Sequence, residues 1–406
     1  MNGMSLAIRD AGAPDGMGGT PPLVPWLRPG VVMHDPAFPV DELLAGFAAE
    51  IGRRGFSVKG FVQRNNDHGR GCASRIELLD VANGHVVGID RAVASLQRIL
   101  VGDADLVVVG RFAAFERAAC ALGGAMREGI SAGLPVLTSV AAKCMGRWHG
   151  FAGCDGALLT PDPGSLWRWW GPDRLYRDLA QGVEDGEVRR IVIGPHWLLV
   201  QGDRGVGLAH LPRGAQHLLA RLKAYRRAGL RGLAGLIGSW DPVERALAVA
   251  AIGADANRPD LAAAAGNGTD IYQGAAGRVV VVGGFPGLAD RLPNAQVIET
   301  NPRPGELPAA AADCLLPGCA AAILTAASLV NRTLPHMLTL AAGARVALVG
   351  PATPLTPRLH VYGIETLSGF IVRDADGIAR AIAAGARPKD FSAFGRFVHM
   401  RAPSTP

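Results

Sequence analysis

Short apolar runs alternate with helical segments between residues 278 and 384, and this alternation constrains the fold more than any other feature of the chain. Near-continuous apolar strands separated by helices are typical of a parallel sheet that is covered on both faces. The strands are predicted at residues 278–283, 295–299, 320–325, 345–350 and 369–373. The helices are predicted at residues 288–292, 308–315, 334–342 and 377–384. The pattern predicts a parallel α/β domain over residues 266–390.

A second region of the same kind occupies residues 30–170, after a Gly- and Pro-rich lead-in over residues 1–29 that we expect to be flexible. Its strands are predicted at residues 29–35, 56–63, 105–110 and 134–140. Helices are predicted at residues 43–53, where Asp41 can cap the first turn, and at residues 116–132. This alternation again indicates a parallel sheet.

Residues 173–265 differ from both regions and indicate a small α+β module. Strands are predicted at residues 188–194, 197–201 and 206–211, and the tight turn at residues 202–205 joins the last two as a β-hairpin. Helices are predicted at residues 216–228 and 242–255. The chain after Pro388 is expected to be irregular, with a tail over residues 391–406. The predicted fold class is thus α/β, with two parallel-sheet domains flanking the small module.

Charge and cysteine content argue against several classes of protein. The net charge of +6, from 41 basic and 35 acidic residues in 406, is mild and dispersed, so we do not expect a nucleic-acid partner. No signal peptide and no apolar stretch of about 18 residues is evident, which predicts a cytoplasmic protein without a membrane span. The six cysteines are then expected to be reduced thiols.

Four strand ends of the carboxy-terminal domain carry residues that packing explains poorly. In an open α/β sheet, ligands bind beyond the carboxyl ends of the strands, near the point where the strand order reverses. We therefore expect residues 283–286, 299–302, 325–331 and 350–354 to converge on one ligand-binding cleft. The candidate ligand-binding residues are Gly283, Gly284, Phe285, Pro286, Glu299, Asn301, Thr325, Asn331, Thr333, Gly350, Pro351 and Thr353, with His196 on the small module.

Structural readings compete with some of these assignments. Asn331 could instead cap the following helix, and residues 350–354 could be a purely structural turn. A Gly-x-Gly-x-x-Gly fingerprint would fall at Gly283, Phe285 and Leu288, where two of the three glycines are missing. An NAD site of the usual kind is therefore not expected.

Metal ligands and catalytic groups are less clearly marked. Glu299 could bind a cation or ribose hydroxyls, and His196 could act as an acid, a base or a ligand, although a packed histidine is the simpler reading. His68 and Cys72 could hold zinc or copper, but two ligands do not complete a tetrahedral site and a solvent-facing loop is the alternative. No Gly-x-Ser-x-Gly or Ser-x-x-Lys signature is present, so no catalytic residue is assigned and enzymatic activity stays open.

Residues 173–390 resemble the "putative heavy-metal chelation" family, which joins an enolase-amino-terminal-like module to a Rossmann-like domain. The matching stretches are residues 194–209, 281–286, 325–333 and 350–354, with Glu299 and Pro302. The resemblance implies a ligand site in the cleft between module and domain, bounded by the hairpin. The chain departs from the family at Ala327, where a second hydroxyl is frequent, and at Gly253, where Asn is common.

Residues 30–170 resemble another family of unassigned domains, related to nucleoside-triphosphatase folds and linked to molybdenum genes. The match is carried by residues 61–63, Cys72, residues 111–116, Gly123, residues 133–137 and Trp148. A working P-loop needs Gly-x-x-x-x-Gly-Lys-Ser/Thr after the first strand. This chain has His-Asp-Pro-Ala-Phe-Pro at residues 34–39, with no lysine, so ATP hydrolysis by that route is not expected.

Three hypotheses follow from these resemblances. The first is a binding or accessory protein for a metal, a metal oxyanion or a metal-chelating small molecule, in molybdenum or other heavy-metal metabolism. The second is an enzyme that holds a nucleotide or S-adenosylmethionine-like cofactor in the same cleft. The third is a scaffold whose first domain binds a partner, and a homodimer is compatible with the exposed hairpin of the small module.

Overall fold

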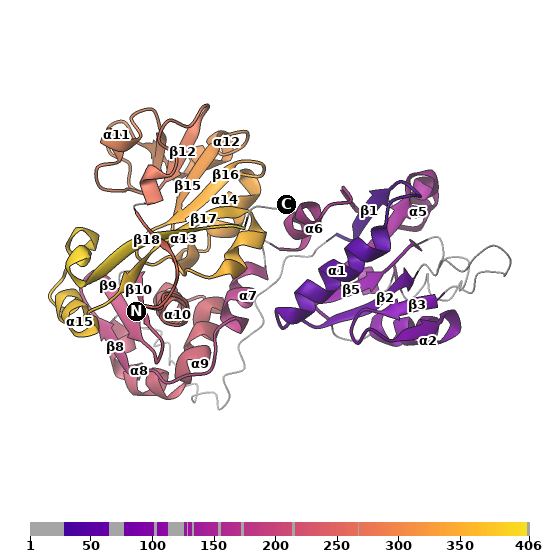
Figure 1. Ribbon diagram of the computed structural model, residues 1–406, viewed down its shortest axis with the longest axis horizontal. Coiled ribbons are helices and arrows are strands. Elements are labelled where there is room, and N and C mark those ends of the chain that lie inside the picture. The colour runs from indigo at the N-terminus through magenta and orange to yellow at the C-terminus, as the bar shows by residue number, and fades with distance from the viewer. Residues whose placement is uncertain are drawn as a thin grey trace, which may run out of the picture.

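The computed structural model describes residues 28–64, 77–100, 104–112, 126–127, 129–131, 134–152, 156–171, 174–212, 216–266 and 268–403. Figure 1 shows the amino-terminal domain on the right and the other two parts of the chain together on the left. Within the described residues, no helix is both long enough and apolar enough to cross a membrane.

The amino-terminal domain is built on a seven-stranded sheet in the order β4-β3-β2-β5-β6-β1-β7. The strands from β2 to β7 in this order are parallel, as predicted, while β3 and β4 extend the edge in antiparallel fashion. The strands are β1 (Gly30–His34), β2 (Val58–Arg64), β3 (Glu77–Asp80), β4 (Val86–Gly88), β5 (Leu106–Val109), β6 (Val136–Ala141) and β7 (Ala157–Leu159). The helices are α1 (Val40–Arg53), α2 (Ile89–Leu100), α5 (Met145–Ala152) and α6 (Pro163–Trp170). The helix predicted over residues 116–132 lies mostly outside the described residues.

The start of α1 corrects one prediction from the sequence. Asp41 does not cap this helix, because Pro39 occupies the N-cap position and Asp41 lies in the first turn. Its carboxylate instead accepts a hydrogen bond from the Gln63 backbone N–H at 3.0 Å and pairs with Arg111 Nε at 2.7 Å. Asp41 therefore links the ends of β2 and β5 through Gln63 and Arg111, and it does not cap its own helix.

The small module has the predicted hairpin. β9 (Trp197–Gln201) pairs antiparallel with β10 (Val206–His210) and with β8 (Arg190–Ile193). α10 (Pro242–Ala256) lies directly on this sheet, since a methyl group on Gly207 would come within 1.9 Å of the Ala250 carbonyl oxygen. The other helices are α7 (Leu175–Gln181), α8 (Gln216–Arg227) and α9 (Gly229–Gly235), of which α9 was not predicted.

The carboxy-terminal domain is an eight-stranded sheet in the order β11-β18-β17-β16-β15-β12-β13-β14. Six neighbouring strands, β17 to β14 in this order, are parallel, in agreement with the prediction. The strands are β11 (Ala264–Ala265), β12 (Val279–Val282), β13 (Gln296–Glu299), β14 (Leu307–Pro308), β15 (Ala321–Thr325), β16 (Arg345–Val349), β17 (Ile364–Val372) and β18 (Gly395–Arg401). The helices are α11 (Leu288–Arg291), α12 (Ala312–Leu315), α13 (Ala327–Val330), α14 (Leu334–Leu340) and α15 (Ala375–Ala383).

The strand order of this sheet reverses beside its first strand. The chain runs outward from β12 to β13, then returns to the other side of β12 and continues through β15, β16 and β17. This is the doubly wound arrangement, and its switch point lies between the carboxyl ends of β12 and β15.

The end of the chain corrects a second prediction. Residues after Pro388 are not irregular: a helical segment, η7 (Pro388–Phe394), leads into β18, which pairs antiparallel with β17 over seven residues. Val398 on β18 is fully buried. The segment predicted as a tail therefore belongs to the sheet.

Asp178 on α7 joins all three parts of the molecule. Its fully buried carboxylate accepts hydrogen bonds from Arg54 at the end of α1, from Arg358, and from the Tyr362 hydroxyl at 2.7 Å. Arg358 and Tyr362 lie on η6 (Pro357–Tyr362), a helical segment of the carboxy-terminal domain. Burial, and next the Asp178 charge, raise the pKa of Tyr362 well above its usual value. Tyr362 therefore stays a neutral donor to this carboxylate.

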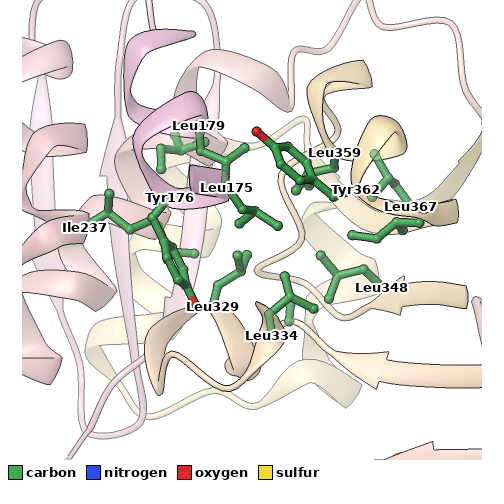
Figure 2. Packing of buried hydrophobic residues seen from close by; sticks show 14 of the residues in the cluster. Leu175, Tyr176, Leu179, Ile237, Leu329, Leu334, Leu348, Leu359, Tyr362 and Leu367 are labelled. Carbon is green, nitrogen blue, oxygen red and sulfur yellow. The ribbon is translucent and has the colours of Figure 1, made fainter. Parts of the chain in front are cut away.

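Apolar side chains fill the boundary between α7 and the carboxy-terminal domain. Figure 2 shows Leu175 and Tyr176 of α7 pointing toward Leu329 on α13, with Leu334 close by. The same buried cluster continues into the amino-terminal domain through Trp167. This part of the boundary is a packed core rather than a site for a ligand.

Candidate functional site at the strand ends

Residues at the carboxyl ends of four strands lie next to one another. A methyl group on Gly283, after β12, would come within 2.6 Å of Thr325 Cβ, and Gly283 has a φ of +109°. A methyl group on Gly284 would come within 2.6 Å of Glu299 Oε1. After β16, one on Gly350 would lie 3.5 Å from Ala326 Cβ. We call these six residues, Gly283, Gly284, Glu299, Thr325, Ala326 and Gly350, the strand-end cluster.

Glycine is required in this cluster for physical reasons. The left-handed φ of Gly283 disfavours any residue with a Cβ, and the Thr325 side chain occupies the space that a Cβ would need. Gly283 itself is buried, and its N–H donates to the Ile298 carbonyl at 2.9 Å, whereas the next residue, Gly284, is exposed and its backbone can be approached. The cluster therefore combines a close backbone approach with one carboxylate and one hydroxyl.

The polar groups of the cluster are tied mainly to their own loops. Glu299 is half-buried, and its Oε2 accepts the Thr300 backbone N–H at 3.1 Å. Glu299 forms no ion pair with a basic side chain in the part of the chain that the structure describes. Thr325 Oγ1 accepts a long hydrogen bond of 3.4 Å from the Ala327 N–H, and its carbonyl accepts the Ser328 hydroxyl at 2.7 Å. Glu299 Oε1 and the Thr325 hydroxyl are thus available to a ligand.

The neighbours of Gly284 and Glu299 also lie at the surface. Pro286 and Asn301 are exposed, and Phe285 is half-buried against the core on the outer side of β12. Of the predicted residues in the loops after β12 and β13, the structure thus places Gly284 against Glu299.

The loop after β15 contains a side-chain-stabilised turn. Asn331 Oδ1 accepts the backbone N–H of Thr333 at 3.1 Å and its hydroxyl at 2.7 Å. Thr333 occupies the N-cap position of α14 but makes no side-chain cap, and Asn331 itself ends α13. Asn331 therefore organises the turn between the two helices, and its exposed amide faces solvent.

The loop after β16 is held by the small module. Asn257, directly after α10, donates from Nδ2 to the Thr353 carbonyl at 3.0 Å and accepts the Leu355 N–H at 2.8 Å. Thr353 is fully buried, while Gly350 and Pro351 are half-buried. The alternative of a structural turn thus fits Thr353, whereas Gly350 stays in the strand-end cluster. The sequence reasoning missed Asn257, and its position at a helix end was the one available signal.

His196 lies far from this cluster. It is exposed in the turn between β8 and β9, and that turn contacts α15, since a methyl group on Gly194 would lie 2.0 Å from the Ile382 carbonyl oxygen. In Figure 1, β8, β9 and α15 lie together at the lower left, whereas β12 and α11 lie at the top. The neighbour of His196 is His210, whose pKa is lowered by burial and by the His196 charge.

A protein-only site for a heavy-metal ion is not present in the described ranges. No group of three or more His, Cys, Asp or Glu side chains is placed there to hold a metal ion. His68, Cys72 and Cys154 lie outside the described residues. Cys319 is buried, which raises the pKa of its thiol, and Cys314 is exposed.

The strand ends of the amino-terminal sheet are arranged differently. The Asp41 carboxylate, 8% exposed, pairs with Arg111, whose backbone N–H donates to Ser139 Oγ at 3.1 Å. In a P-loop protein this position, at the start of the first helix, receives phosphate groups. Here a buried carboxylate occupies it, which opposes anion binding. A hollow of about 390 Å³ opens elsewhere in this domain, lined in part by Asp80, Arg91 and Arg98.

Comparisons with known proteins divide the chain in the same way. The family DUF364, described as "Putative heavy-metal chelation", matches residues 269–401, and DUF4213, with the same description, matches residues 176–254. DUF2478, a family of unknown function, matches residues 30–95 and 85–169. The resemblance of residues 173–390 to the heavy-metal chelation family is thus confirmed.

Named and solved proteins resemble parts of the chain. The chain is 29% identical over 161 residues to molybdenum import ATP-binding protein ModC 2 of Bradyrhizobium diazoefficiens, a match that covers 35% of this chain and 18% of that protein. A DUF364 protein of Pyrococcus horikoshii is 21% identical, with a TM-score of 0.48, over 56% of this chain and 98% of that one. A DUF364 protein of unknown function from Desulfitobacterium hafniense is 30% identical, with a TM-score of 0.53, over 57% of this chain and 99% of that chain. Since nearly the whole of that protein aligns with it at this identity, the chain belongs to the DUF364 family.

Proposed function

We propose that the strand-end cluster binds a metal in complexed form, as a metal chelate, and that the chain is an accessory protein of heavy-metal metabolism. The observation that carries the proposal is the contact of Gly283, Gly284, Glu299 and Thr325 at the switch point of the sheet. Ligands of doubly wound sheets bind at this position. The family description supports a metal as part of the ligand.

The side-chain oxygen atoms of the cluster indicate whether a metal would bind as a bare ion or as a complex. Soft heavy-metal ions prefer thiolate and imidazole, whereas the cluster offers the Glu299 carboxylate, the Thr325 hydroxyl and backbone groups. Among the described residues, no set of three ionisable side chains completes a coordination sphere. The residues thus do not fit a naked heavy-metal ion. They fit a ligand that brings its own donor atoms, with Glu299 accepting hydrogen bonds from that ligand.

Molybdenum is the metal that the comparisons favour. The named relative is a molybdenum import protein, although this chain spans only 18% of its length. Molybdate carries only acceptor oxygens, so the Glu299 carboxylate would repel it as a free anion. A molybdenum chelate whose organic part donates hydrogen bonds is the form that fits Glu299. We include a role in molybdenum handling in the proposal on this basis.

Elemental analysis tests the proposal directly. We expect the full chain, purified without added metal, to retain molybdenum or another heavy metal, and the Glu299→Ala variant to lose most of it. Thermal shift with preformed metal chelates and with molybdate gives a second measurement. Neither retained metal nor any shift in the unaltered protein would contradict the proposal.

A second candidate function is favoured by the position of Glu299. It ends the strand next to β12 and reaches Gly284, where an acidic residue of a Rossmann-like sheet can accept bonds from ribose hydroxyls. An enzyme with a nucleotide or S-adenosylmethionine-like cofactor would show stabilisation by that compound, and Glu299→Ala would abolish it. The absence of metal together with this stabilisation would favour the second function.

A further inference from the structure

A large aromatic side chain is exposed beside the loop after β15. Trp240 is 75% exposed, although an indole normally contributes to a core or an interface. It lies between η3 (Leu236–Gly238) and α10, and the guanidinium carbon of Arg332 lies 5.5 Å from its ring centroid. The same carbon lies 5.2 Å from the ring centroid of Tyr176. Arg332 is thus held by two aromatic rings, of which one is open to solvent.

Arg332 is held there at a conformational cost. Its φ is +64°, in the left-handed region that residues other than glycine and asparagine seldom adopt. Strained residues of this kind persist where the surroundings fix them, and they gather at ligand sites. The two ring contacts and a hydrogen bond from Nη1 to the Gly238 carbonyl at 3.3 Å fix this one.

A second guanidinium lies next to Arg332. Arg245 is buried and donates from Nε to the Val330 carbonyl at 2.6 Å and from Nη1 to the Ser239 and Trp240 carbonyls at 2.9 Å. Burial, and next the charge of Arg332, lower the pKa of Arg245. Neither arginine forms a salt bridge with a carboxylate among the described residues, although Asp241 nearby offsets part of the charge. Two like charges at this place favour the approach of an anion.

We propose that Arg332 and Trp240 form a binding site for an aromatic carboxylate. The planar guanidinium of Arg332 matches a carboxylate in two parallel hydrogen bonds, and the open indole face of Trp240 can stack on a planar ring. Arg245 adds a fixed positive charge behind them. Arg332 lies between Asn331 and Thr333 in the loop after β15, the strand whose end contributes Thr325 to the strand-end cluster. The site rests on the proposed function only in taking the aromatic carboxylate to be the chelator that carries the metal.

Titration calorimetry with picolinate, a pyridine carboxylate that chelates metals, tests the site on metal-free protein. We expect picolinate to bind, and acetate and pyridine to bind at least about tenfold more weakly. Acetate keeps only the carboxylate that pairs with Arg332, and pyridine keeps only the ring that stacks on Trp240. Arg332→Gly should weaken picolinate binding by about tenfold or more, and Trp240→Ala by about threefold to tenfold. Arg380→Ala, at an exposed position on α15, is the control and should bind normally.

Arg332→Gly also keeps the test independent of folding. Glycine fits a φ of +64°, so the variant should melt at the same temperature as the unaltered protein or higher. Failure of picolinate to bind, or unchanged affinity in folded Arg332→Gly, would overturn the site.

The outcomes for the site and for the proposed function are separable. If metal-free picolinate binds through Arg332 but the full chain purified without added metal retains no metal, the anion site stands and the metal function fails. If metals bind through Glu299 while picolinate does not bind, the metal function stands and the anion site fails.

Discussion

The molecule contains two sheets with parallel strands, and the carboxylate at the strand ends is buried and paired in one sheet but partly exposed and unpaired with a basic side chain in the other, among the residues that the structure describes. In the amino-terminal sheet, the Asp41 carboxylate is buried and satisfied by Gln63 and Arg111. In the carboxy-terminal sheet, Glu299 is half-buried and bonded only to its own loop among the described residues. We call the strand ends of the amino-terminal sheet the closed edge, because the Asp41–Arg111 ion pair fills them. We call those of the carboxy-terminal sheet the open edge, because the Glu299 carboxylate lies there beside Gly284.

The comparison indicates which of the two sheets binds a ligand at its strand ends. Doubly wound sheets often bind ligands beyond the carboxyl ends of their strands. In the amino-terminal domain the Asp41–Arg111 ion pair fills this position, whereas in the carboxy-terminal domain the exposed Gly284 lies there beside Glu299. We infer that the carboxy-terminal sheet carries the ligand and that the amino-terminal domain is attached to it through Asp178.

The largest effect is expected where the two domains are joined. Asp178→Ala removes the common acceptor of Arg54, Arg358 and Tyr362, and it leaves the buried Arg54 and the half-buried Arg358 without this carboxylate. Removal of one partner from a buried ion pair typically costs about 3–5 kcal/mol. Chemical denaturation should show this loss, and proteolysis should release the amino-terminal domain more readily. Unchanged stability would mean that the joint is not held by this carboxylate.

A smaller loss is expected at the closed edge. Asp41→Ala leaves the Gln63 N–H without its acceptor and Arg111 without its partner, at a cost of about 2 kcal/mol. Ligand binding should be unaffected, as measured by calorimetry with the ligand of the carboxy-terminal sheet. Loss of binding with retained folding would show that the closed edge also takes part in function.

At the open edge, Gly283→Ala tests whether the packing of Gly283 against Thr325 matters for binding. The added methyl group meets Thr325 and must adopt a φ of +109°, which costs about 1–2 kcal/mol. We expect binding to fall more than stability, because the methyl group displaces the Thr325 side chain, whose hydroxyl belongs to the strand-end cluster. Gly363→Ala has a comparable φ of +91° and open space around it, and is the matched control in thermal denaturation and binding.

The smallest effect on stability is expected for Glu299→Ala. Its carboxylate keeps one hydrogen bond of 3.1 Å to the Thr300 N–H, so the free energy of unfolding should change by about 0.5 kcal/mol or less. The same change should remove most ligand binding. A large loss of stability would mean that Glu299 stabilises the fold, as Asp41 does, and that the two edges do not differ in this respect.

The sheets and the hairpin were predictable because their apolar patterns are local. β12, β15 and β16 are runs of buried aliphatic residues, and the turn before β10 is marked by glycines. β18 was not predicted, because Arg396, His399 and Arg401 interrupt its apolar pattern and only pairing with β17 makes it a strand.

The candidate site was predictable in part. The convergence of Gly283, Glu299 and Thr325 follows from parallel strands in one sheet. The separation of His196, the burial of Thr353 by Asn257 and the left-handed Arg332 depend on contacts between distant segments, and no local pattern marks such contacts.

The most direct test of the central claim compares the two carboxylates in one measurement. Elemental analysis of the full chain, of Asp41→Asn and of Glu299→Gln, each purified in the same way, measures retained metal per chain. We predict that Asp41→Asn retains as much metal as the unaltered protein and that Glu299→Gln loses most of it. Equal retention in Glu299→Gln, or loss confined to Asp41→Asn, would contradict the assignment of the ligand to the carboxy-terminal sheet.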